Sequence, residues 1–546
     1  MTSARRGGDR TSEVGSRRPE LRRLEVTSRA GALAVGSAAV FVVLLLASLH
    51  AVGGNSDGAT VVLEGQAIRE GHVVLHGWSL SYDSFWTIDA PIYALAVLIV
   101  GVRTALMNVV PCLIATAVVM LSVFLAVERR RRAGAIAAGL TVLGLLALPS
   151  RALSLFFLAG PYHVGTVLLC LVGFTALRRG GFGAGFIVAA VAFAAGLLGD
   201  LQMLELGVLP ALGAAGVAMW RANDRRAQLP RLLAPLLGVL LAIVARAVAV
   251  ALGAFSITRA NPFASGHEIL TNARHLLSFG AALLGLDAGP FGPTGVPGPL
   301  LALHLVGAVV VVAATLAALA GLAARLVRPA DGADGPSAWR LEDVLGLALL
   351  GDLAAFVVLP ITPSDAYARY LTGALIFGSV LGGRRVGALF DQLGAPRRRA
   401  IGALGLLVFG LFGVGFALFL RGPSAARPAS GLSSFLSAHR LTLGVGDYWS
   451  SSILSVESGG SVLVRPVVAT PAGRLVRYDK QSSAGWYDGA AFQFYVYDAG
   501  FIWDGDDRAV AAATFGRPAR TYVFGSYRVL VWPDTITVSS SGSIGP

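Results

Sequence analysis

The chain has 546 residues, of which 55% are hydrophobic and 14% are charged, and its mean hydropathy is +0.70. A soluble domain of this length would not be so apolar. Long apolar runs of about 20 residues are typical of transmembrane helices, because that length crosses the hydrocarbon core. The net charge of +13 sits in short clusters between these runs, which excludes a nucleic-acid-binding stripe.

The cysteines and the N-terminal region further limit the class of protein to which the chain can belong. Cys112 and Cys170 lie inside apolar runs, which argues against a disulfide scaffold or a cysteine-based metal site. Lys480 is the only lysine, a bias typical of GC-rich genomes such as those of actinobacteria. We expect residues 1–29, which are arginine-rich, to form a disordered cytoplasmic tail. The apolar run from Ala30 to Val52 has no convincing cleavage site, so we interpret it as a retained first span.

The apolar stretch from Ala90 to Val127 is too long for one transmembrane helix and awkward for two. We place Asp89 outside and the basic cluster Arg129–Arg132 inside, because cytoplasmic loops collect arginine. An odd number of crossings then separates them. We therefore predict one span from about Thr104 to Val127, and an interfacial helix on the outer leaflet from Pro91 to Val102.

The same parity argument predicts a mainly α-helical, polytopic bundle of about eleven spans over residues 30–421. Every strong basic cluster then falls in a cytoplasmic turn, for example Arg221–Arg231 and Arg397–Arg399. The remaining spans are expected near residues 133–149, 163–178, 182–199, 205–220, 232–254, 299–324, 341–361, 369–384 and 400–421.

Three segments on the outer side are large and polar: 53–103, 255–298 and 422–546. The last one begins with a linker rich in proline, alanine and serine, and continues with short β-type runs between turn residues. These runs are Ser461–Val468, Ala491–Tyr497, Arg520–Phe524 and Tyr527–Trp532. We predict a small extracytoplasmic C-terminal domain, of β or α/β class, built on a sheet.

The first outer segment interleaves acids, histidines and aromatics between Gly71 and Tyr93. Asp83 and Asp89 are its candidate catalytic acids, and Trp86 and Tyr93 are candidate substrate-binding aromatics. Aromatic faces stack on sugar rings, and carboxylates bind hydroxyl groups or act as bases. The alternative is an aromatic belt at the membrane surface with solvated acids.

Further candidates lie at the outer ends of later spans. Asp200 is a third candidate catalytic acid and Glu205 a candidate substrate-binding residue, although their spacing does not put both on one helix face. His163 opens the span that begins near it and is a candidate substrate-binding residue. The structural alternatives are a helix cap for Asp200 and a purely structural role for His163.

Arg369 and Tyr370 enter a span from the outer side, where an arginine opposes the positive-inside bias and needs a partner. A phosphate or a carboxylate would serve, because arginine binds both through two hydrogen bonds. The alternative partner is Asp365. Arg246 and Asp352 lie within spans at comparable depth, so we expect them to pair, more readily as a structural ion pair than as a proton relay.

The sequence contains no soluble-enzyme signature. It has no P-loop, no Rossmann glycine fingerprint, no His-Glu-x-x-His motif and no cysteine metal cluster. We therefore expect no organic cofactor, while a requirement for a divalent metal stays open.

In its architecture the chain resembles the GT-C superfamily of integral-membrane glycosyltransferases. A first span leads into a long acidic outer loop that ends in Pro91-Ile92-Tyr93, and a span with a basic turn follows. An acid, Asp200, stands at a later outer helix end, and Arg369-Tyr370-Leu371 opens a late span. A C-terminal extracytoplasmic domain completes the resemblance.

The resemblance implies a donor sugar carried on a polyprenyl phosphate, and an acid of the first outer loop that acts as base or orients the acceptor. It points to Asp83 or Asp89 as the base and to Asp200 as a second acid. The usual acid close behind the first span is only weakly matched by Asp57, and there is no clear Asp-x-Asp motif. These departures leave the base and the metal requirement open.

We therefore expect a plasma-membrane glycosyltransferase that uses a lipid-linked sugar donor and a cell-envelope glycan, lipid or protein acceptor, with no nucleic-acid partner. A lipid-linked donor needs a polar pocket at the outer leaflet, with a base and a cation for the phosphate leaving group. The alternatives are a transporter or flippase for a lipid-linked glycan, and a non-catalytic envelope-assembly protein. Transporters tend to contain repeats and broken helices at mid-membrane, of which the sequence gives no clear sign.

Overall fold

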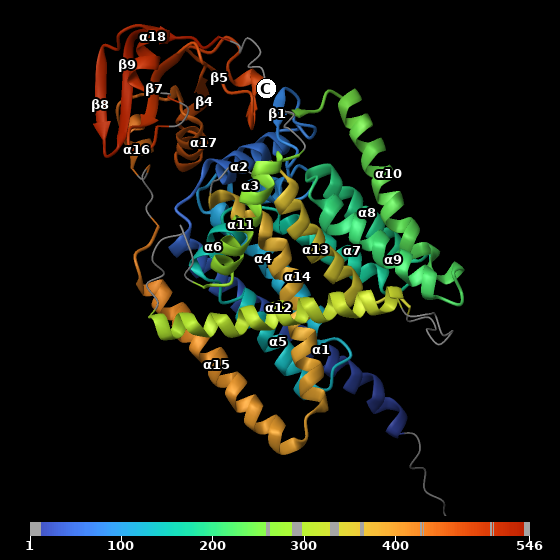
Figure 1. Ribbon diagram of the computed structural model, residues 1–546. Coiled ribbons are helices and arrows are strands. Elements are labelled where there is room, and N and C mark those ends of the chain that lie inside the picture. Colours follow the sequence, from blue (N-terminus) through green and yellow to red (C-terminus); the bar gives the residue numbers. More distant parts are fainter. Residues whose placement is uncertain are drawn as a thin grey trace, which may run out of the picture.

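The computed structural model describes residues 13–257, 263–286, 297–327, 338–360, 365–425, 429, 431–502, 505 and 507–539. Apolar helices form a bundle, and a mixed β-sheet domain covers one end of it (Figure 1). The helices of the bundle and its outer loops are α1 (Glu13–Ala51), α2 (Ser56–Arg69), α3 (Ala90–Val100), α4 (Leu106–Val127), α5 (Arg132–Leu146), α6 (Arg151–Phe157), α7 (Val164–Leu177), α8 (Ala184–Gly199), η1 (Leu204–Val208), α9 (Leu209–Arg221), η2 (Arg226–Gln228), α10 (Leu229–Ala251), α11 (Gly266–Leu283), α12 (Gly298–Val327), α13 (Leu341–Val358), η3 (Asp365–Leu371), α14 (Thr372–Gln392) and α15 (Ala395–Arg421).

In the part of the chain that the structure describes, six helices are long and apolar enough to cross a membrane, and a bent pair would make a seventh. The multi-span helical bundle predicted from the sequence is therefore confirmed. The full number of about eleven spans stays a prediction, because α7 and α8 have only 14 and 16 residues. At about 1.5 Å per residue they are shorter than a hydrocarbon core of about 30 Å.

Two boundaries differ from the expectation for physical reasons. In the span predicted over 133–149, α5 ends at Leu146, and α6 follows at an angle of 86°, because Pro149 disfavours a continuing helix. Helix α1 begins at Glu13, within the segment expected to be disordered. Glutamate, arginine and leucine between Glu13 and Ala30 are good helix formers, so the helix continues toward the N-terminus beyond the apolar span Ala30–Ala51. Residues 1–12 of the predicted tail lie outside the described residues.

The apolar stretch between Ala90 and Val127 forms two separate helices, α3 and α4, as the parity argument predicts. Gly101, with a φ of 74°, ends α3 and separates it from α4. Tyr93 and Val97 of α3 are buried, whereas Leu98 and Ile99 are 62% and 72% exposed. The position of α3 on the outer leaflet remains a prediction.

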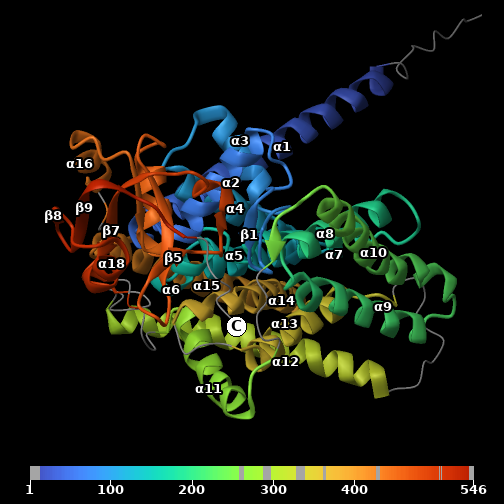
Figure 2. The same cartoon turned by 90° about the horizontal axis from the view of Figure 1, so that it is seen from above.

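A small sheet joins three segments that are far apart in the sequence. Strand β1 (Trp78–Leu80) pairs in parallel with β2 (Ser256–Ile257) and antiparallel with β6 (Ser482–Ser483). The first outer loop, the segment after α10 and the C-terminal domain therefore meet at one end of the bundle (Figure 2).

The C-terminal domain is built on a six-stranded sheet in the order β5-β4-β3-β7-β9-β8. Its elements are α16 (Leu432–Ala438), β3 (Leu443–Gly446), α17 (Tyr448–Glu457), β4 (Leu463–Ala469), β5 (Leu475–Arg477), η4 (Ala484–Trp486), β7 (Phe492–Asp498), α18 (Arg508–Phe515), β8 (Arg520–Phe524) and β9 (Tyr527–Ile536). The four predicted β-type runs correspond to β4, β7, β8 and β9. The sequence prediction missed β3, whose four residues include Gly444 and Gly446, because glycine is depleted in strands.

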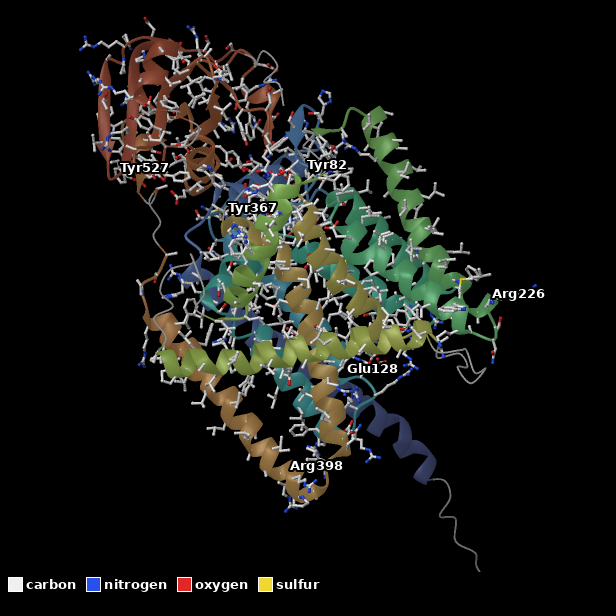
Figure 3. The ribbon with its side chains drawn as sticks, in the orientation of Figure 1. Tyr82, Glu128, Arg226, Tyr367, Arg398 and Tyr527 are labelled. Atoms are coloured by element: carbon white, nitrogen blue, oxygen red, sulfur yellow. The ribbon has the colours of Figure 1, made fainter. Side chains whose placement is uncertain are left out.

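The two ends of the bundle differ in their side chains. Tyr82 and Tyr367 lie at the end beneath the C-terminal domain, and Arg398 lies at the opposite end (Figure 3). An apolar groove of about 470 Å³ between α5, α12, α14 and α15 reaches Arg398 and Arg399. The groove therefore belongs to the end that carries the basic turns.

Candidate functional site

Arg369 is a cation at the end of the bundle that faces the C-terminal domain. It lies on η3, directly before α14. Its guanidinium carbon is 5.2 Å from the ring centre of Tyr162, 5.9 Å from that of Tyr367 and 5.1 Å from that of Tyr370. Its Nε is buried without a hydrogen-bond partner among the described residues. An arginine that is partly surrounded by aromatic rings and has a buried N–H group without a hydrogen-bond partner is suited to binding an anionic ligand.

Asp57 is a carboxylate that forms an ion pair with this arginine. Its Oδ2 lies 3.8 Å from an Nη of Arg369, a loose contact, and both side chains are mostly buried. Asp57 lies in the first turn of α2, where the side chain of Asn55 caps the helix by accepting a hydrogen bond from the Gly58 N–H. The helix start thus holds the acid beside the cation. The side chain of Asp365, the alternative partner, lies outside the described residues.

Asp83 approaches the same cation from the loop after β1. The loop is tied to the end of α8, because the Phe85 N–H and the Ser84 hydroxyl both donate to the carbonyl of Gly199. Burial alone would raise the pKa of Asp83, but the charges of His163 and Arg369 lower it below its ordinary range. Asp83 is therefore ionised at neutral pH, as a base must be.

His163 and Asp200 form a buried dyad. His163 Nδ1 lies 2.8 Å from Asp200 Oδ2, and Thr166 donates to the same oxygen. The Gln202 N–H donates to Asp200 Oδ1 at 2.9 Å. Because the carboxylate accepts, Nδ1 carries the hydrogen, and Nε2 has no partner in the part of the chain that the structure describes. His163 has a φ of 62°, a left-handed conformation that is costly for this residue and common at functional sites.

Asp89 belongs to a second, more deeply buried set of groups. Its Oδ2 has no hydrogen-bond partner within the described ranges, nor has Glu64 Oε2 or the Tyr93 hydroxyl. Burial and the negative charge of Asp200 raise the pKa of Asp89 to about 8, and burial and Asp89 raise the pKa of Glu64. A carboxyl group that is mostly protonated at pH 7 is a poor base, so the geometry favours Asp83 over Asp89.

The other predicted residues take different positions. Tyr370 joins the site, since its ring lies 4.7 Å from that of His163. Trp86 packs on Phe255 and donates from Nε1 to the carbonyl of Val73, so it holds the outer loops together. Glu205 lies in η1, a single π-helical turn.

The predicted pair of Arg246 and Asp352 is wrong. Arg246 donates to the carbonyl of Phe255 and lies over its ring, at 4.4 Å. Asp352 accepts from the side chain of Gln202 at 3.3 Å and from the Ala374 N–H at 2.5 Å. Similar depth along two helices does not bring side chains together when they project in different directions.

The sequence prediction gave little weight to Asp57, and it did not single out Tyr162 or Tyr448. Tyr448 of the C-terminal domain donates to Asp57 Oδ1 at 2.5 Å. An asparagine cap directly after the first span is the signal that could have drawn attention to Asp57. Within the described ranges, no three histidine, cysteine, aspartate or glutamate side chains come together in a way that could hold a metal ion.

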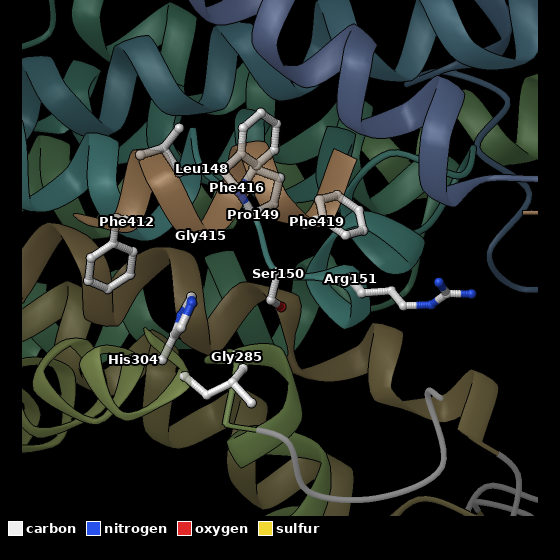
Figure 4. A pocket seen from close by; sticks show the side chains of 11 residues that line it. Leu148, Pro149, Ser150, Arg151, Gly285, His304, Phe412, Gly415, Phe416 and Phe419 are labelled. Carbon is white, nitrogen blue, oxygen red and sulfur yellow. The ribbon is translucent and has the colours of Figure 1, made fainter. Parts of the chain in front are cut away.

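A small cavity of about 20 Å³ lies away from these acids (Figure 4). Its lining includes Ser150, His304 and three phenylalanines of α15. None of the acids near Arg369 lines this cavity. It is therefore separate from the candidate site.

The fold is of the GT-C type. The structure of ArnT from Cupriavidus metallidurans in the apo state matches with a TM-score of 0.53 and 13% identity, over 92% of this chain and 98% of ArnT. ArnT bound to undecaprenyl phosphate matches with a TM-score of 0.52 and 14% identity, over 91% of this chain and 97% of ArnT. An oligosaccharyltransferase from Archaeoglobus fulgidus matches more weakly, with a TM-score of 0.46 and 12% identity, over 92% of this chain and 76% of that one. No family model and no curated protein sequence matches the chain.

Proposed function

We propose that this chain is a membrane glycosyltransferase that transfers a sugar from a polyprenyl-phosphate donor to a cell-envelope glycan, lipid or protein acceptor. One observation carries the proposal: Arg369, with an unused buried donor, has Asp57 at 3.8 Å and lies close enough to Asp83 to lower its pKa. A cation beside ionised acids is the pair of charges that displacement of a phosphate from a sugar carbon requires.

The reaction follows from these charges. Asp83 accepts the proton of the acceptor hydroxyl group as its oxygen forms a bond to the anomeric carbon. The bond between that carbon and the phosphate oxygen breaks, and the phosphate leaves with the electron pair. Arg369 stabilises the negative charge on the leaving phosphate, and arginine can do so through two hydrogen bonds. The His163–Asp200 dyad holds the imidazole in the same region, where its charge, together with that of Arg369, favours the ionised form of Asp83.

The proposed site lies on the outer face of the plasma membrane, with the N-terminus in the cytoplasm. Two features support this orientation: basic residues such as Arg398 collect at the opposite end, and the acids, β1 and the C-terminal domain share one end (Figure 3). The ArnT structure that matches with undecaprenyl phosphate bound supports a lipid phosphate as the donor carrier.

The lipids of a deletion strain test the proposal. We expect a polyprenyl-phosphate sugar to accumulate in the outer leaflet and a glycan product to be lost. Re-expression of Asp83→Asn or Arg369→Gln should not restore the product, whereas Asp224→Asn, a change of an exposed carboxylate near Arg226, should restore it fully. Accumulation in the inner leaflet would instead indicate a flippase, and an unchanged lipid and glycan profile would contradict both functions.

A further inference from the structure

The C-terminal domain touches the proposed site through one side chain. Tyr448 is the first residue of α17, is 4% exposed and donates its hydroxyl hydrogen to Asp57 Oδ1 at 2.5 Å. The other oxygen of the same carboxylate is the one that faces Arg369. The two carboxylate oxygens of Asp57 therefore contact different partners: Oδ2 contacts Arg369 of the bundle, and Oδ1 contacts Tyr448 of the C-terminal domain.

Helix α17 is docked on α2 by matched polar contacts. Ser56 donates to the backbone carbonyl of Tyr448 at 2.6 Å, and Thr60 donates to the Ser452 hydroxyl at 2.9 Å. Both pairs have the same sequence separation, so the first turns of the two helices lie side by side and follow the same chain direction. This register places the Tyr448 ring against the first turn of α2, which carries Asp57.

A second contact orients the tyrosine hydroxyl. Gln481 lies within hydrogen-bond distance of the Tyr448 hydroxyl. One phenolic hydrogen cannot be donated to two acceptors, and the oxygen and nitrogen of an amide are interchangeable in position. If the Gln481 amide donates to the phenolic oxygen, the hydrogen remains for Asp57, and both groups are satisfied. Gln481 directly precedes β6, which is fixed by its pairing with β1.

We infer that Tyr448 is a positioning residue for the proposed transfer reaction, and that the C-terminal domain is required because it fixes the Asp57 carboxylate beside Arg369. The inference rests on the proposed function. It predicts that the hydroxyl group of Tyr448, rather than the docking of the domain in general, determines the rate of transfer.

The test first compares three single variants of the full-length protein in liposomes that contain undecaprenyl-phosphate-linked sugar extracted from the deletion strain. Tyr448→Phe keeps the ring and removes the hydroxyl group, and we expect kcat to fall about 10- to 100-fold, the range for a hydrogen bond to a charged group. The donor KM should change less than about twofold, because the ring packing is kept. Gln481→Ala should give a smaller fall in kcat. Ser452→Ala, the matched control, removes one docking bond without touching Asp57 and should keep kcat.

A double variant tests whether Tyr448 acts on transfer through Asp57 or independently of it. If Tyr448 acts through Asp57, adding Tyr448→Phe to Asp57→Asn should cause no further loss. Full activity of Tyr448→Phe beside an inactive Asp57→Asn would overturn the inference, as would an equal loss in Ser452→Ala. If Tyr448→Phe does not reach the membrane, full activity of Gln481→Ala would overturn it. No transfer by the wild type would count against the proposed function itself.

Discussion

Replacement of Asp89 by asparagine tests whether the buried carboxyl group of Asp89 is protonated in the folded protein, in contrast to the ionised Asp83. In the folded protein burial and the charge of Asp200 raise the pKa of Asp89 to about 8. In the unfolded chain the pKa of Asp89 is about 4. At roughly 1.4 kcal/mol per pH unit, the difference corresponds to roughly 5 kcal/mol of stability, as an order of magnitude.

The direction in which stability changes with pH follows from the number of protons that each state binds. Between about pH 4 and pH 8 the unfolded chain loses the Asp89 proton while the folded protein keeps it. The folded state therefore binds more protons, and its stability falls as the pH rises through this window. Asparagine is neutral throughout, so Asp89→Asn removes this part of the pH dependence. Buried acids that Asp89 does not influence titrate alike in both proteins and cancel in the comparison, whereas the pKa of Glu64 falls in the variant because the charge of Asp89 that helps to raise it is removed.

The assay is thermal unfolding of the purified protein in detergent between pH 5 and pH 9. We expect the melting temperature of the wild type to fall by several degrees more than that of Asp89→Asn between pH 5 and pH 8. The variant should also keep transfer activity, because a protonated Asp89 is not the base. Parallel pH curves for the two proteins, or an inactive Asp89→Asn at normal membrane level, would refute this reasoning.

Three further predictions concern the groups around the site. Arg369→Lys replaces a planar fork by a single ammonium group, and we expect the affinity for undecaprenyl phosphate to fall about 10- to 100-fold in a direct binding measurement. Gly165→Ala would put Cβ 2.5 Å from Ile88 Cγ2, so we expect a loss of about 1–3 kcal/mol, seen as a lower melting temperature. Gly405→Ala, which meets no atom within 4 Å, should melt no lower than the wild type. Asp200→Asn removes the charged acceptor of the imidazole N–H, and transfer measured in liposomes should fall at least about tenfold.

Much of the fold could be predicted from the sequence because hydrophobic periodicity and basic turns act locally. The runs that became α4 and α15 are long and apolar, with the arginines of α15 confined to its two ends, and the β-type runs of the C-terminal domain alternate with turn residues. The bend at Pro149 and the short α7 and α8 were harder to predict. Helices of 14 or 16 residues are indistinguishable from spans when the flanking loops are also apolar.

The candidate site was predicted in part. Asp83, His163, Asp200 and Arg369 lie at ends of apolar runs that the sequence analysis predicts to face the outer side, and the structure brings them into one cluster. The parity argument fixes the end of the bundle on which a residue lies, but not the direction in which its side chain projects. For that reason the expected Arg246 pair was wrong. The contact of Tyr448 with Asp57 spans 391 residues and depends on how a whole domain docks, which no local pattern reports.

Transfer by the purified wild type and by Asp83→Asn tests the central claim most directly. Both proteins would be reconstituted in liposomes with a radiolabelled polyprenyl-phosphate sugar and an envelope extract as acceptor. We predict that the wild type moves label from the lipid to the extract and releases polyprenyl phosphate, and that Asp83→Asn binds the lipid but transfers at least about 100-fold more slowly. Equal transfer by the two proteins, or movement of the intact labelled lipid between leaflets without release of polyprenyl phosphate, would contradict the account.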